Sequence, residues 1–348
     1  MNIRPIEKSK LGTVDFDNLD FGSTFSDHMF VCDYANGSWG EPEIVPYAPL
    51  QLDPSASALH YGQAIFEGMK AYKDDKGDVF LFRPDQNIKR LNKSAERLAI
   101  PQFQEKLFIE GLHKLIDLER DWIKKGEGKS LYIRPFVIAT QYAIQASPSS
   151  TYKFMIICAP ATLYYTKKLK VLIADKYSRA ASGGVGYAKA AGNYAGQFFP
   201  TNLAKKQGFD QIIWTDSNEH KYLEEAGTMN VFFRINDSLV TAPITDTILD
   251  GVTRKSIIQI ANDMGINVEI KKISTNELID SAKKGDLKEI FGAGTAATIE
   301  PISSIAFGND NYMIPTSNSN HFHVKVLNYL TDYKLGRVED KFKWLVHI

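Results

Sequence analysis

Several features that would mark other classes of protein are absent from this sequence. Only two cysteines, Cys32 and Cys158, occur among the 348 residues. They lie far apart and form no Cys-x-x-Cys pair, so the sequence predicts neither a disulfide framework nor a zinc ribbon. No apolar run has the length of a membrane span, and the first ten residues lack the apolar core of a signal peptide. Together these absences indicate a protein of the reducing cytoplasm.

An excess of charge of either sign is also missing. The chain has 41 lysines and arginines and 41 acidic residues, a balance that favours neither nucleic acid nor an acidic membrane surface as a partner. Its length exceeds the usual size of a single core. We therefore expect two domains, with enough material for a deep cleft.

Strand and helix patterns alternate in both halves of the chain, which predicts a mixed α/β (α+β) fold. In the first half the expected elements are a strand at 78–84, helices at 85–98 and 108–125, and strands at 130–142 and 152–160. In the second half they are helices at 195–207, 252–264 and 276–284, and strands at 171–174, 211–215, 231–235, 268–272 and 288–291. Because a basic patch and a glycine-rich stretch follow residue 164, we expect domains at 1–164 and 179–348, joined by a linker at 165–178.

Lys189 is the only charged residue between Ser182 and Gly196, a stretch composed mostly of small side chains. Small apolar surroundings can remove water from an ammonium group, and desolvation favours the neutral amine that attacks a carbonyl carbon. One interpretation is therefore an imine-forming lysine. The other is a flexible glycine loop whose lysine faces water, and the local pattern leaves both open.

Two cations, Arg254 and Lys255, fall in the first turn of the helix expected at 252–264, where the helix dipole disfavours positive charge. A phosphate would reconcile them with this position, because backbone amides at the start of a helix bind anions. The alternative is an N-cap at Asp250 with both cations in solvent. The local sequence supports the two interpretations equally.

The segment from Gly292 to Ala297 has the form G-x-G-x-x-A, which also occurs in dinucleotide-binding folds. About fifty residues follow it, too few for the paired halves of a Rossmann domain. We expect this turn to offer its amides and the Thr295 hydroxyl to a phosphate instead. The segment from Gly126 to Ser130 ends like a P-loop, but Ile123 stands where that motif requires glycine.

Other groups of residues also suit ligands. Glu224 and Glu225 precede an apolar strand, so we expect one of them to point inward, toward an arginine or a protonated heteroaromatic nitrogen, unless the segment is a solvated turn. Tyr132 and Arg134 share one face of a strand, a combination that suits a carboxylate. The His-Phe-His segment at 321–323 has no neighbouring cysteine or acidic ligand pattern, so no metal site is expected.

Five sets of residues occur in a defined order along the chain. They are Leu59-His60-Tyr61 with Phe66-Glu67-Gly68, Leu131-Tyr132-Ile133-Arg134-Pro135, Gly192-Asn193-Tyr194, Glu225-Ala226-Gly227-Thr228-Met229-Asn230, and Gly294-Thr295-Ala296. In order and spacing they resemble the signatures of branched-chain amino acid aminotransferases, over nearly the whole chain. The resemblance implies a two-domain, fold type IV homodimer with pyridoxal 5′-phosphate at the domain interface.

Carried over residue by residue, the resemblance implies that Lys189 forms the Schiff base with the cofactor and moves the proton between substrate Cα and cofactor C4′. Glu225 would keep the pyridine nitrogen protonated, and the positive ring is the electron sink of the reaction. Tyr194 would hydrogen-bond the phenolic oxygen. The phosphate would be held by Arg90, the backbone amides of Val252 and Thr253, and Thr295.

For the substrate, the resemblance implies an apolar pocket with Arg134 at its edge, suited both to leucine, isoleucine or valine and to the side-chain carboxylate of glutamate. The pocket walls would be Tyr61, Phe66, Tyr132 and Tyr164, with Tyr61 supplied by the neighbouring subunit. The α-carboxylate would meet Thr228 and the amides of Thr295 and Ala296. The implied reaction is reversible ping-pong transamination of these amino acids with 2-oxoglutarate.

Other activities compete with this interpretation. A D-amino acid aminotransferase or an aminodeoxychorismate lyase would keep the fold and cofactor, but the Tyr-x-Arg-Pro strand favours the branched-chain enzyme. A nucleotide-dependent dehydrogenase built on the 292–297 turn lacks a Rossmann context, and a non-catalytic binding protein conflicts with the intact set of Lys189, Glu225, Tyr194 and Arg90. At 297–300 the chain has Ala-Thr-Ile-Glu where mammalian members have a redox Cys-x-x-Cys. We therefore expect no thiol regulation there and a microbial or plant-like branch of the family.

Overall fold

The computed structural model describes residues 1–162, 168–296 and 298–348. The chain forms two compact units. The first comprises Met1–Tyr164, Ala188–Gly192 and Thr331–Ile348, and the second comprises Tyr165–Tyr187 and Asn193–Leu330. This division differs from the continuous C-terminal domain expected from the sequence, because the segment that carries Lys189 and the chain end both group with the first unit. The expected linker also contains a strand, β10 (Leu169–Ile173), whose alternate side chains are buried.

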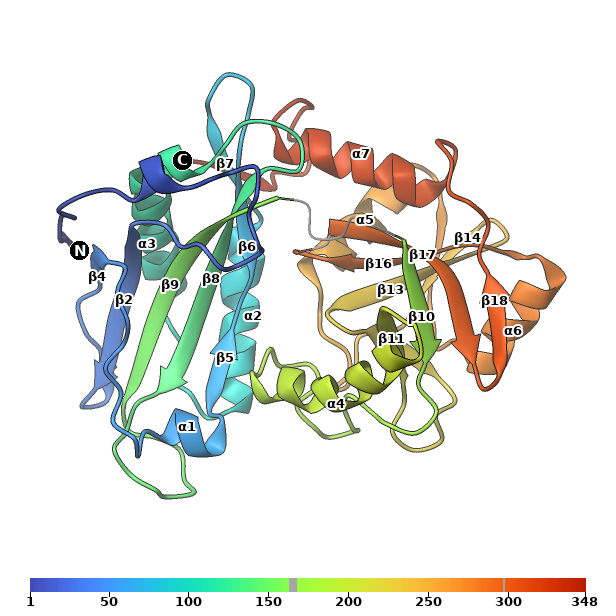
Figure 1. Ribbon diagram of the computed structural model, residues 1–348, viewed down its shortest axis with the longest axis horizontal. Coiled ribbons are helices and arrows are strands. Elements are labelled where there is room, and N and C mark those ends of the chain that lie inside the picture. The colour runs from blue at the N-terminus through green and yellow to red at the C-terminus, as the bar shows by residue number, and fades with distance from the viewer. Residues whose placement is uncertain (163–167, 297) are drawn as a thin grey trace. The chain divides into compact units, whose positions relative to one another are not determined.

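The first unit is built on one sheet with the strand order β1-β4-β2-β9-β8-β6-β7-β19 (Figure 1). Strand β3 adds to β2, and β5 adds to β8. The bounds are β1 (Asn2–Ile3), β2 (His28–Ala35), β3 (Ser38–Trp39), β4 (Glu43–Pro46), β5 (Ala64–Phe66), β6 (Met69–Lys73), β7 (Val79–Phe82), β8 (Ser130–Ala139), β9 (Tyr152–Ala161) and β19 (Leu345–His347). Because β19 pairs with β7, the C-terminus belongs to this unit.

Helices α2 (Pro84–Arg97) and α3 (Glu105–Leu118) pack on one face of this sheet (Figure 1). Side chains at helical spacing in α2, including Ile88, Leu91 and Ala95, are buried there. The shorter elements are α1 (Ser57–Tyr61) and 3-10 turns at Leu11–Thr13 and Arg120–Trp122. The sequence predicts α2 correctly to within one residue at each end.

The helix expected at 108–125 instead ends at Leu118. The next residue, Glu119, is almost fully buried and turns toward strand β2. Its carboxylate accepts a hydrogen bond from the Asp27 backbone amide at 2.9 Å and contacts His28 Nδ1 at 2.5 Å. The carboxylate just beyond the helix thus binds partners that lie far away in sequence, and helical periodicity alone does not predict such contacts.

The second unit has the strand order β12-β11-β10-β17-β16-β13-β14-β15, with β18 on β17. Strand β12 also pairs with β13, so six of these strands close into a ring. The bounds are β10 (Leu169–Ile173), β11 (Gln211–Thr215), β12 (Leu223–Ala226), β13 (Met229–Ile235), β14 (Ser238–Thr241), β15 (Asn267–Ile270), β16 (Leu287–Gly294), β17 (Thr298–Phe307) and β18 (Asp310–Met313). The helices are α4 (Gly192–Lys206), α5 (Val252–Asp263), α6 (Thr275–Lys284) and α7 (Phe322–Lys334).

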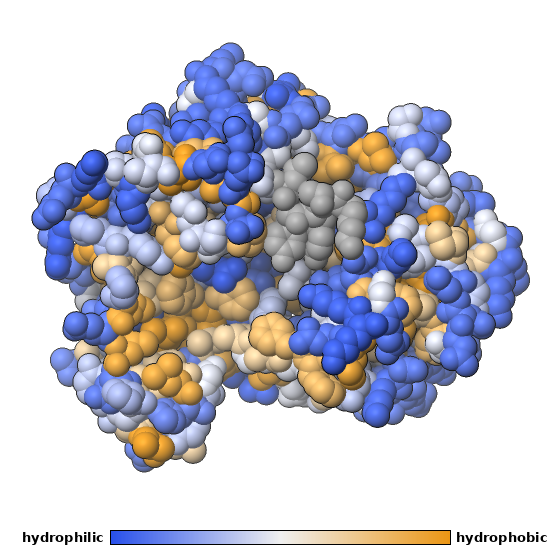
Figure 2. Space-filling view, in the orientation of Figure 1, coloured by the Kyte–Doolittle hydropathy of each residue, from blue (hydrophilic) through white to orange (hydrophobic). Residues whose placement is uncertain are grey.

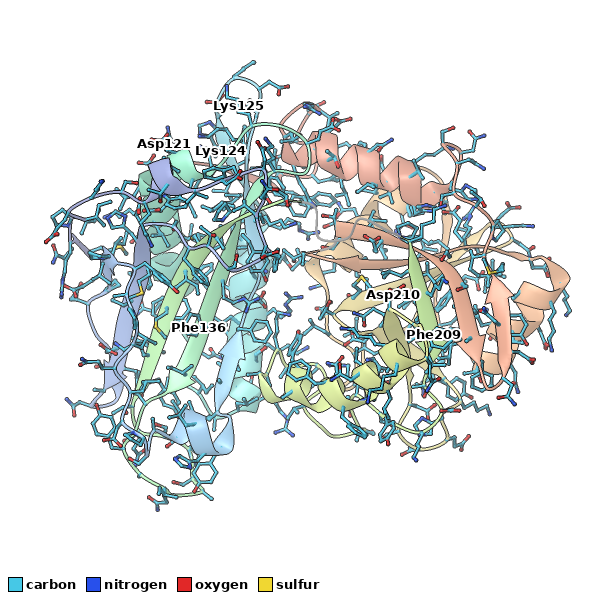
Figure 3. All side chains as sticks on the ribbon, viewed as in Figure 1. Asp121, Lys124, Lys125, Phe136, Phe209 and Asp210 are labelled. Carbon is cyan, nitrogen blue, oxygen red and sulfur yellow. The ribbon has the colours of Figure 1, made fainter. Side chains whose placement is uncertain are left out.

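Strands β10 and β11 run parallel, with α4 between them in sequence. Asp210 ties their ends together (Figure 3), since its Oδ2 accepts from the Lys170 amide at 2.9 Å and its own amide donates to the Lys170 carbonyl at 2.8 Å. The sequence predicts β11, α5 and α6 to within one residue. The alternative of a solvated turn at Glu224 and Glu225 is wrong, because both residues lie in β12 and are buried.

Within the described residues, no helix combines the length and the apolar character needed to cross a bilayer.

Candidate active site

Lys189 is held in a short extended segment of the first unit. Its backbone amide donates to Ser94 Oγ in α2 at 2.9 Å, and its carbonyl accepts from the Phe66 amide at 3.1 Å. The following residue, Ala190, forms an antiparallel bridge with Ile65. The lysine is half-buried, and its backbone is fixed by α2 and β5. The flexible-loop interpretation therefore fails at Lys189 itself.

The Phe66 ring brings two cations together. Lys189 Nζ lies 4.6 Å from the ring centroid, and the Arg134 guanidinium carbon also lies 4.6 Å from it. Arg134 donates to the Tyr132 hydroxyl at 2.9 Å, across the shared face of β8 that the alternation predicts. Arg134 Nε is buried and has no hydrogen-bond partner in the described part of the chain. This arrangement gives an aromatic wall next to a cation that suits an anionic substrate.

Gly68 faces the same tyrosine. A Cβ atom at Gly68 would lie 2.3 Å from the Tyr132 hydroxyl oxygen, so only glycine leaves room for this side chain. Gly68 belongs to one of the five signatures, which by itself predicts no role for it. Its function here is to let strand β6 begin directly beside the tyrosine that contacts Arg134.

Arg90 and Glu67 form a buried ion pair in the first unit. Arg90 Nε donates to Glu67 Oε1 at 2.7 Å, and a terminal nitrogen of Arg90 donates to Oε2 at 2.8 Å. Asn87 adds a hydrogen bond to Oε2 at 2.8 Å. Burial alone would raise the pKa of Glu67, but the charge and hydrogen bonds of Arg90, and then the charge of Lys189, hold this pKa below its ordinary value. The sequence pattern predicts Arg90 as a phosphate ligand but does not indicate Glu67 as its carboxylate partner.

Two other residues, Tyr61 and Tyr164, are expected at the substrate. Tyr61 ends α1 and is 45% exposed in the single chain. Tyr164 lies outside the described residues.

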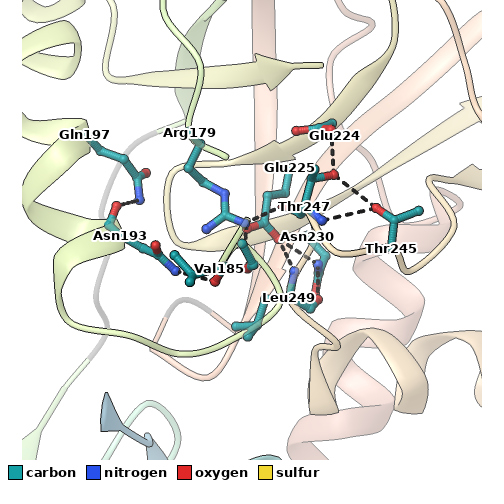
Figure 4. Close-up of polar contacts among 11 residues, drawn as sticks. Arg179, Val185, Asn193, Gln197, Glu224, Glu225, Asn230, Thr245, Thr247 and Leu249 are labelled. Atoms are coloured by element: carbon teal, nitrogen blue, oxygen red, sulfur yellow. Dashed lines mark hydrogen bonds and ion pairs between the residues drawn. The ribbon is translucent and has the colours of Figure 1, made fainter. Parts of the chain in front are cut away.

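In the second unit, Glu225 is the centre of a buried polar cluster (Figure 4). Its Oε1 accepts from Arg179 at 2.8 Å. Its Oε2 accepts from Asn230 Nδ2 at 3.1 Å and from the Leu249 amide at 3.2 Å. The inward acid expected from the sequence is thus present. Its arginine partner lies 46 positions earlier in the chain, and no local pattern indicates it. These donors all favour the ionised carboxylate, the form that accepts a hydrogen bond from a protonated ring nitrogen.

Helix α5 begins beside this cluster. Its N-cap residue, Gly251, supplies no side chain to the first-turn amides of Val252 and Thr253. A Cβ at Gly251 would lie 2.0 Å from Asn230 Oδ1, so glycine is required for the helix to start this close to the Asn230 side chain. Glycine at this position therefore leaves the start of α5 without a side-chain cap, as anion binding by backbone amides requires.

The two cations in the first turn of α5 do not need a phosphate to explain them. Arg254 is buried and donates to the Ala242 carbonyl at 2.8 Å, and Lys255 pairs with Asp250 at 2.7 Å. The alternative of solvated cations with an Asp250 N-cap is also wrong, since Gly251 is the N-cap and Arg254 is buried. These two charges therefore give no support for a phosphate, and the phosphate stays a prediction that depends on the backbone geometry of the helix start.

The remaining predicted ligands lie at turns of the second unit. Thr228 follows β12, and its carbonyl oxygen would be 3.2 Å from a Cβ at Gly294, the last residue of β16. Thr295 and Ala296 come next as a half-buried turn. The pairing of Asn230 with Ala293 places these two turns at the same end of the sheet as Glu225. Tyr194 is half-buried in the first turn of α4.

The histidine segment has protein partners. His323 Nδ1 contacts Glu289 Oε2 at 2.6 Å, and its Nε2 contacts Ser317 Oγ at 3.0 Å. In the part of the chain that the structure covers, no three or more His, Cys, Asp or Glu residues are grouped to hold a metal ion.

A family model for amino-transferase class IV matches residues 64–305, which include every predicted ligand described above except Tyr61. The chain belongs to the class IV aminotransferases. The family and fold predicted from the sequence are thereby confirmed.

Curated relatives of this aminotransferase match almost its whole length. A probable branched-chain-amino-acid aminotransferase of Staphylococcus epidermidis is 46% identical over 96% of the chain and 94% of the relative. Branched-chain-amino-acid transaminase 1 of Bacillus subtilis is 45% identical over 96% and 95%. Among solved structures, the Escherichia coli branched-chain amino acid aminotransferase superposes with a TM-score of 0.76 at 26% identity, covering 92% of this chain and 98% of that one.

Class IV aminotransferases use pyridoxal 5′-phosphate, and each unit, taken by itself, has groups whose chemistry suits part of that cofactor. The first unit provides a half-buried amine at Lys189. The second provides a buried carboxylate at Glu225 for the ring nitrogen and a glycine-capped helix start for the phosphate.

Proposed function

We propose that this chain catalyses reversible transamination between L-leucine, L-isoleucine or L-valine and 2-oxoglutarate, giving the branched-chain 2-oxo acids and L-glutamate. The 45–46% identity to branched-chain enzymes over nearly the full length supports this substrate class. The observation that carries the proposal is the Phe66 ring, which has Lys189 Nζ and the Arg134 guanidinium each 4.6 Å from its centroid. The amine that reacts and the cation that receives a side-chain carboxylate thus meet at one apolar surface.

The roles of the residues follow from their chemistry. When bound, pyridoxal 5′-phosphate supplies an electron sink for the negative charge that develops at substrate Cα. Lys189 would hold the cofactor covalently, and its amine would move the proton at substrate Cα. Glu225 accepts a hydrogen bond from the ring nitrogen and, as a carboxylate, stabilises the proton on it. Tyr194 donates to the phenolic oxygen. The residues that would hold the phosphate are Arg90, Val252 and Thr253 through their amides, and Thr295.

Substrate selection uses apolar walls with polar groups at the edges. Phe66 and Tyr132 contact the branched side chain, with Tyr61 and Tyr164 completing the pocket. Arg134 binds the second carboxylate of glutamate, a role that suits its buried Nε, which has no partner among the described residues. Thr228 and the amides of Thr295 and Ala296 bind the α-carboxylate. A pocket with one cation at its margin accepts both an apolar branch and a carboxylate in successive half-reactions.

A visible absorption spectrum before and after borohydride reduction tests the cofactor and the lysine together. We expect absorbance from a lysine-bound cofactor, its loss on reduction, and a modified peptide that contains Lys189. Lys189→Ala should abolish turnover, whereas Lys206→Ala, on the exposed side of α4, should not. Activity that persists in Lys189→Ala would refute the assignment of the lysine. A steady-state rate with D-alanine above that with L-leucine would reassign the enzyme to the D-amino acid branch of the fold.

We also propose that the enzyme is a cytoplasmic homodimer in which Tyr61 completes the partner's pocket. Large apolar side chains of α1 and the loop that follows β8 are exposed in the single chain, and Figure 2 shows hydrophobic surface over α1. They are Leu59, Tyr61, Tyr142 and Ile144, with exposed fractions of 61%, 45%, 72% and 73%. The Ala56–Tyr142 bridge joins the loop to α1. A group of exposed large apolar side chains is typical of an interface.

Sedimentation velocity tests the dimer. We expect the double variant Tyr142→Glu, Ile144→Glu to sediment as a monomer and to lose activity, because two buried charges would oppose association. The control is Ile270→Glu on β15, which is 52% exposed and should leave the dimer intact. A fully active monomeric wild type would contradict the shared site.

A further inference from the structure

Thr247 links a second buried carboxyl group, that of Glu224, to the Arg179–Glu225 ion pair (Figure 4). The Thr247 hydroxyl donates to Glu224 Oε1 at 2.6 Å, and the Thr247 carbonyl accepts from the Arg179 guanidinium at 2.5 Å. The same Arg179 nitrogen donates to the Gly186 carbonyl at 2.8 Å. Glu224, Arg179 and Glu225 are therefore parts of one buried network.

This network contains two carboxyl groups and one guanidinium. Arg179 and Glu225 neutralise each other, with both side chains 4% exposed. Glu224 is 9% exposed, and its Oε2 is buried with no hydrogen-bond partner among the described residues. A buried carboxylate whose oxygen lacks a donor is unfavourable, whereas a protonated carboxyl group carries no charge. The geometry thus favours a proton on Glu224 as long as no further cation joins the network.

The surroundings of Glu224 also favour its protonated form. Burial raises the pKa of the Glu224 carboxyl to about 7, against the opposing effects of the Thr247 hydrogen bond and the Arg179 charge. The charges of Glu225 and Asp216 reinforce the increase. Near neutral pH, a small change in local charge is then enough to move this proton.

We propose that Glu224 is a positioning residue that keeps a proton next to the Arg179–Glu225 pair and releases it when a protonated ring nitrogen binds to Glu225. This inference rests on the proposed function, since it requires the ring nitrogen to be bound by Glu225. The added positive charge of the nitrogen is balanced by the new negative charge of Glu224. In this step only the Glu224 O–H bond breaks, its proton passes to solvent, and no electrons are transferred.

The consequence is that cofactor binding is linked to proton release. With Glu224 ionised, the site holds two negative and two positive charges. Without that second carboxylate, the protonated nitrogen would leave one positive charge uncompensated in a buried site. Glu224 therefore acts through Glu225 to stabilise the charged form of the ring, and it need not touch the substrate.

Calorimetric titration of the cofactor-free full chain with pyridoxal 5′-phosphate tests this inference. Titrations in two buffers of different ionisation enthalpy give the number of protons released per cofactor bound. At pH 6, where Glu224 is mostly protonated, wild type should release up to one proton more than Glu224→Gln. At pH 8.5 the difference should vanish, because Glu224 is already ionised. The Gln variant keeps the shape of the side chain without its proton, and Lys189 contributes equally in both proteins.

A second variant, Thr247→Val, and an infrared measurement on the wild type test the same inference independently. Thr247→Val removes the hydrogen bond that lowers the Glu224 pKa, so the extra proton release should persist to higher pH. In wild type alone, the infrared band of a protonated carboxyl group should disappear when the cofactor is added at pH 6. Equal proton counts in wild type and Glu224→Gln at pH 6, or an unchanged carboxyl band, would overturn the inference. Failure to bind the cofactor at all would instead refute the proposed function.

Discussion

Arg90 uses two of its three guanidinium nitrogens to bind both carboxylate oxygens of Glu67, at 2.7 and 2.8 Å. The Glu67 carboxylate is fully buried, and Arg90 is 8% exposed. Two-point pairing of this kind fixes the plane of the guanidinium. Glu67 therefore orients the arginine that we propose as a phosphate ligand, and it does so from the connection between β5 and β6, next to the Lys189 segment.

Glu67→Gln should destabilise the first unit strongly. It leaves Arg90 buried beside a neutral amide, and removal of one member of a buried pair lowers the free energy of unfolding by about 3–5 kcal/mol. Urea unfolding measures the change. Glu110→Gln is the control, because its partner Lys106 is 3.8 Å away and both side chains are exposed, and it should change stability by less than about 0.5 kcal/mol. Equal stabilities of the two variants would show that the Glu67 pair does not stabilise the fold.

Gly251→Ala should weaken cofactor binding. The backbone of Gly251 is in a region that alanine also adopts, so the effect is steric: the new Cβ would lie 2.0 Å from Asn230 Oδ1. Asn230 must then move away from Glu225, or α5 must shift. We expect at least a tenfold loss of cofactor affinity, about 1.4 kcal/mol, measured by titration of the cofactor absorbance.

Gly196→Ala provides the matched control for this substitution. Gly196 lies inside α4, and a Cβ added there would meet no described atom within 4 Å beyond the helix's own backbone and its chain neighbours. Alanine there should leave affinity unchanged and raise the stability of the helix by about 0.5–1 kcal/mol. Unchanged affinity in Gly251→Ala would show that the start of α5 does not depend on close contact with Asn230.

In the variant Glu289→Gln, the stability of the protein should change less with pH in the acid range than in wild type. Glu289 accepts from the Phe322 and His323 amides at 2.9 and 3.0 Å and so anchors the start of α7. Burial opposes ionisation, but the hydrogen bonds and charge of His323 hold the pKa of Glu289 below its ordinary value. Because its pKa is lower in the folded state, ionised Glu289 stabilises the fold. This contribution to the free energy of unfolding is complete above the pKa of the unfolded state, about 4.3, and is lost as the pH falls through the lower pKa of the folded state.

Melting temperatures of wild type and Glu289→Gln between pH 3 and 7 measure this effect. At pH 7 the variant should be less stable by about 1–3 kcal/mol, as expected for lost hydrogen bonds to a charged group. This difference in stability between wild type and Glu289→Gln should become smaller as the pH falls below 5. A gap that stays constant down to pH 3 would show that the charge of Glu289 contributes nothing.

The two cysteine thiols should be unreactive in the folded protein. Burial raises the pKa of Cys32 to about 11 and raises that of Cys158 well above its ordinary value, and the thiolate is the reactive form. An aromatic disulfide reagent at pH 8 should therefore label neither thiol in native protein and both in denaturant. Rapid labelling of native protein would contradict their burial.

The sequence by itself predicts features that depend on local periodicity. Alternation along β8 places Tyr132 and Arg134 on one face, and they are hydrogen-bonded there. Helical spacing predicts α2 and its buried face, and composition alone singles out Lys189. The ordered signatures predict the family, which the comparisons confirm. Strand alternation and helical spacing can be predicted in this way because the local backbone geometry determines which side of the strand or helix each side chain faces.

Only the tertiary structure decides which distant charges meet. Glu225 pairs with Arg179 across 46 positions and Glu67 with Arg90 across 23, and the first-turn cations of α5 find protein acceptors instead of a phosphate. These partnerships depend on strand pairing and on the exclusion of water. A buried charge must be compensated by whatever group the fold brings within hydrogen-bonding distance, and no local pattern specifies that group.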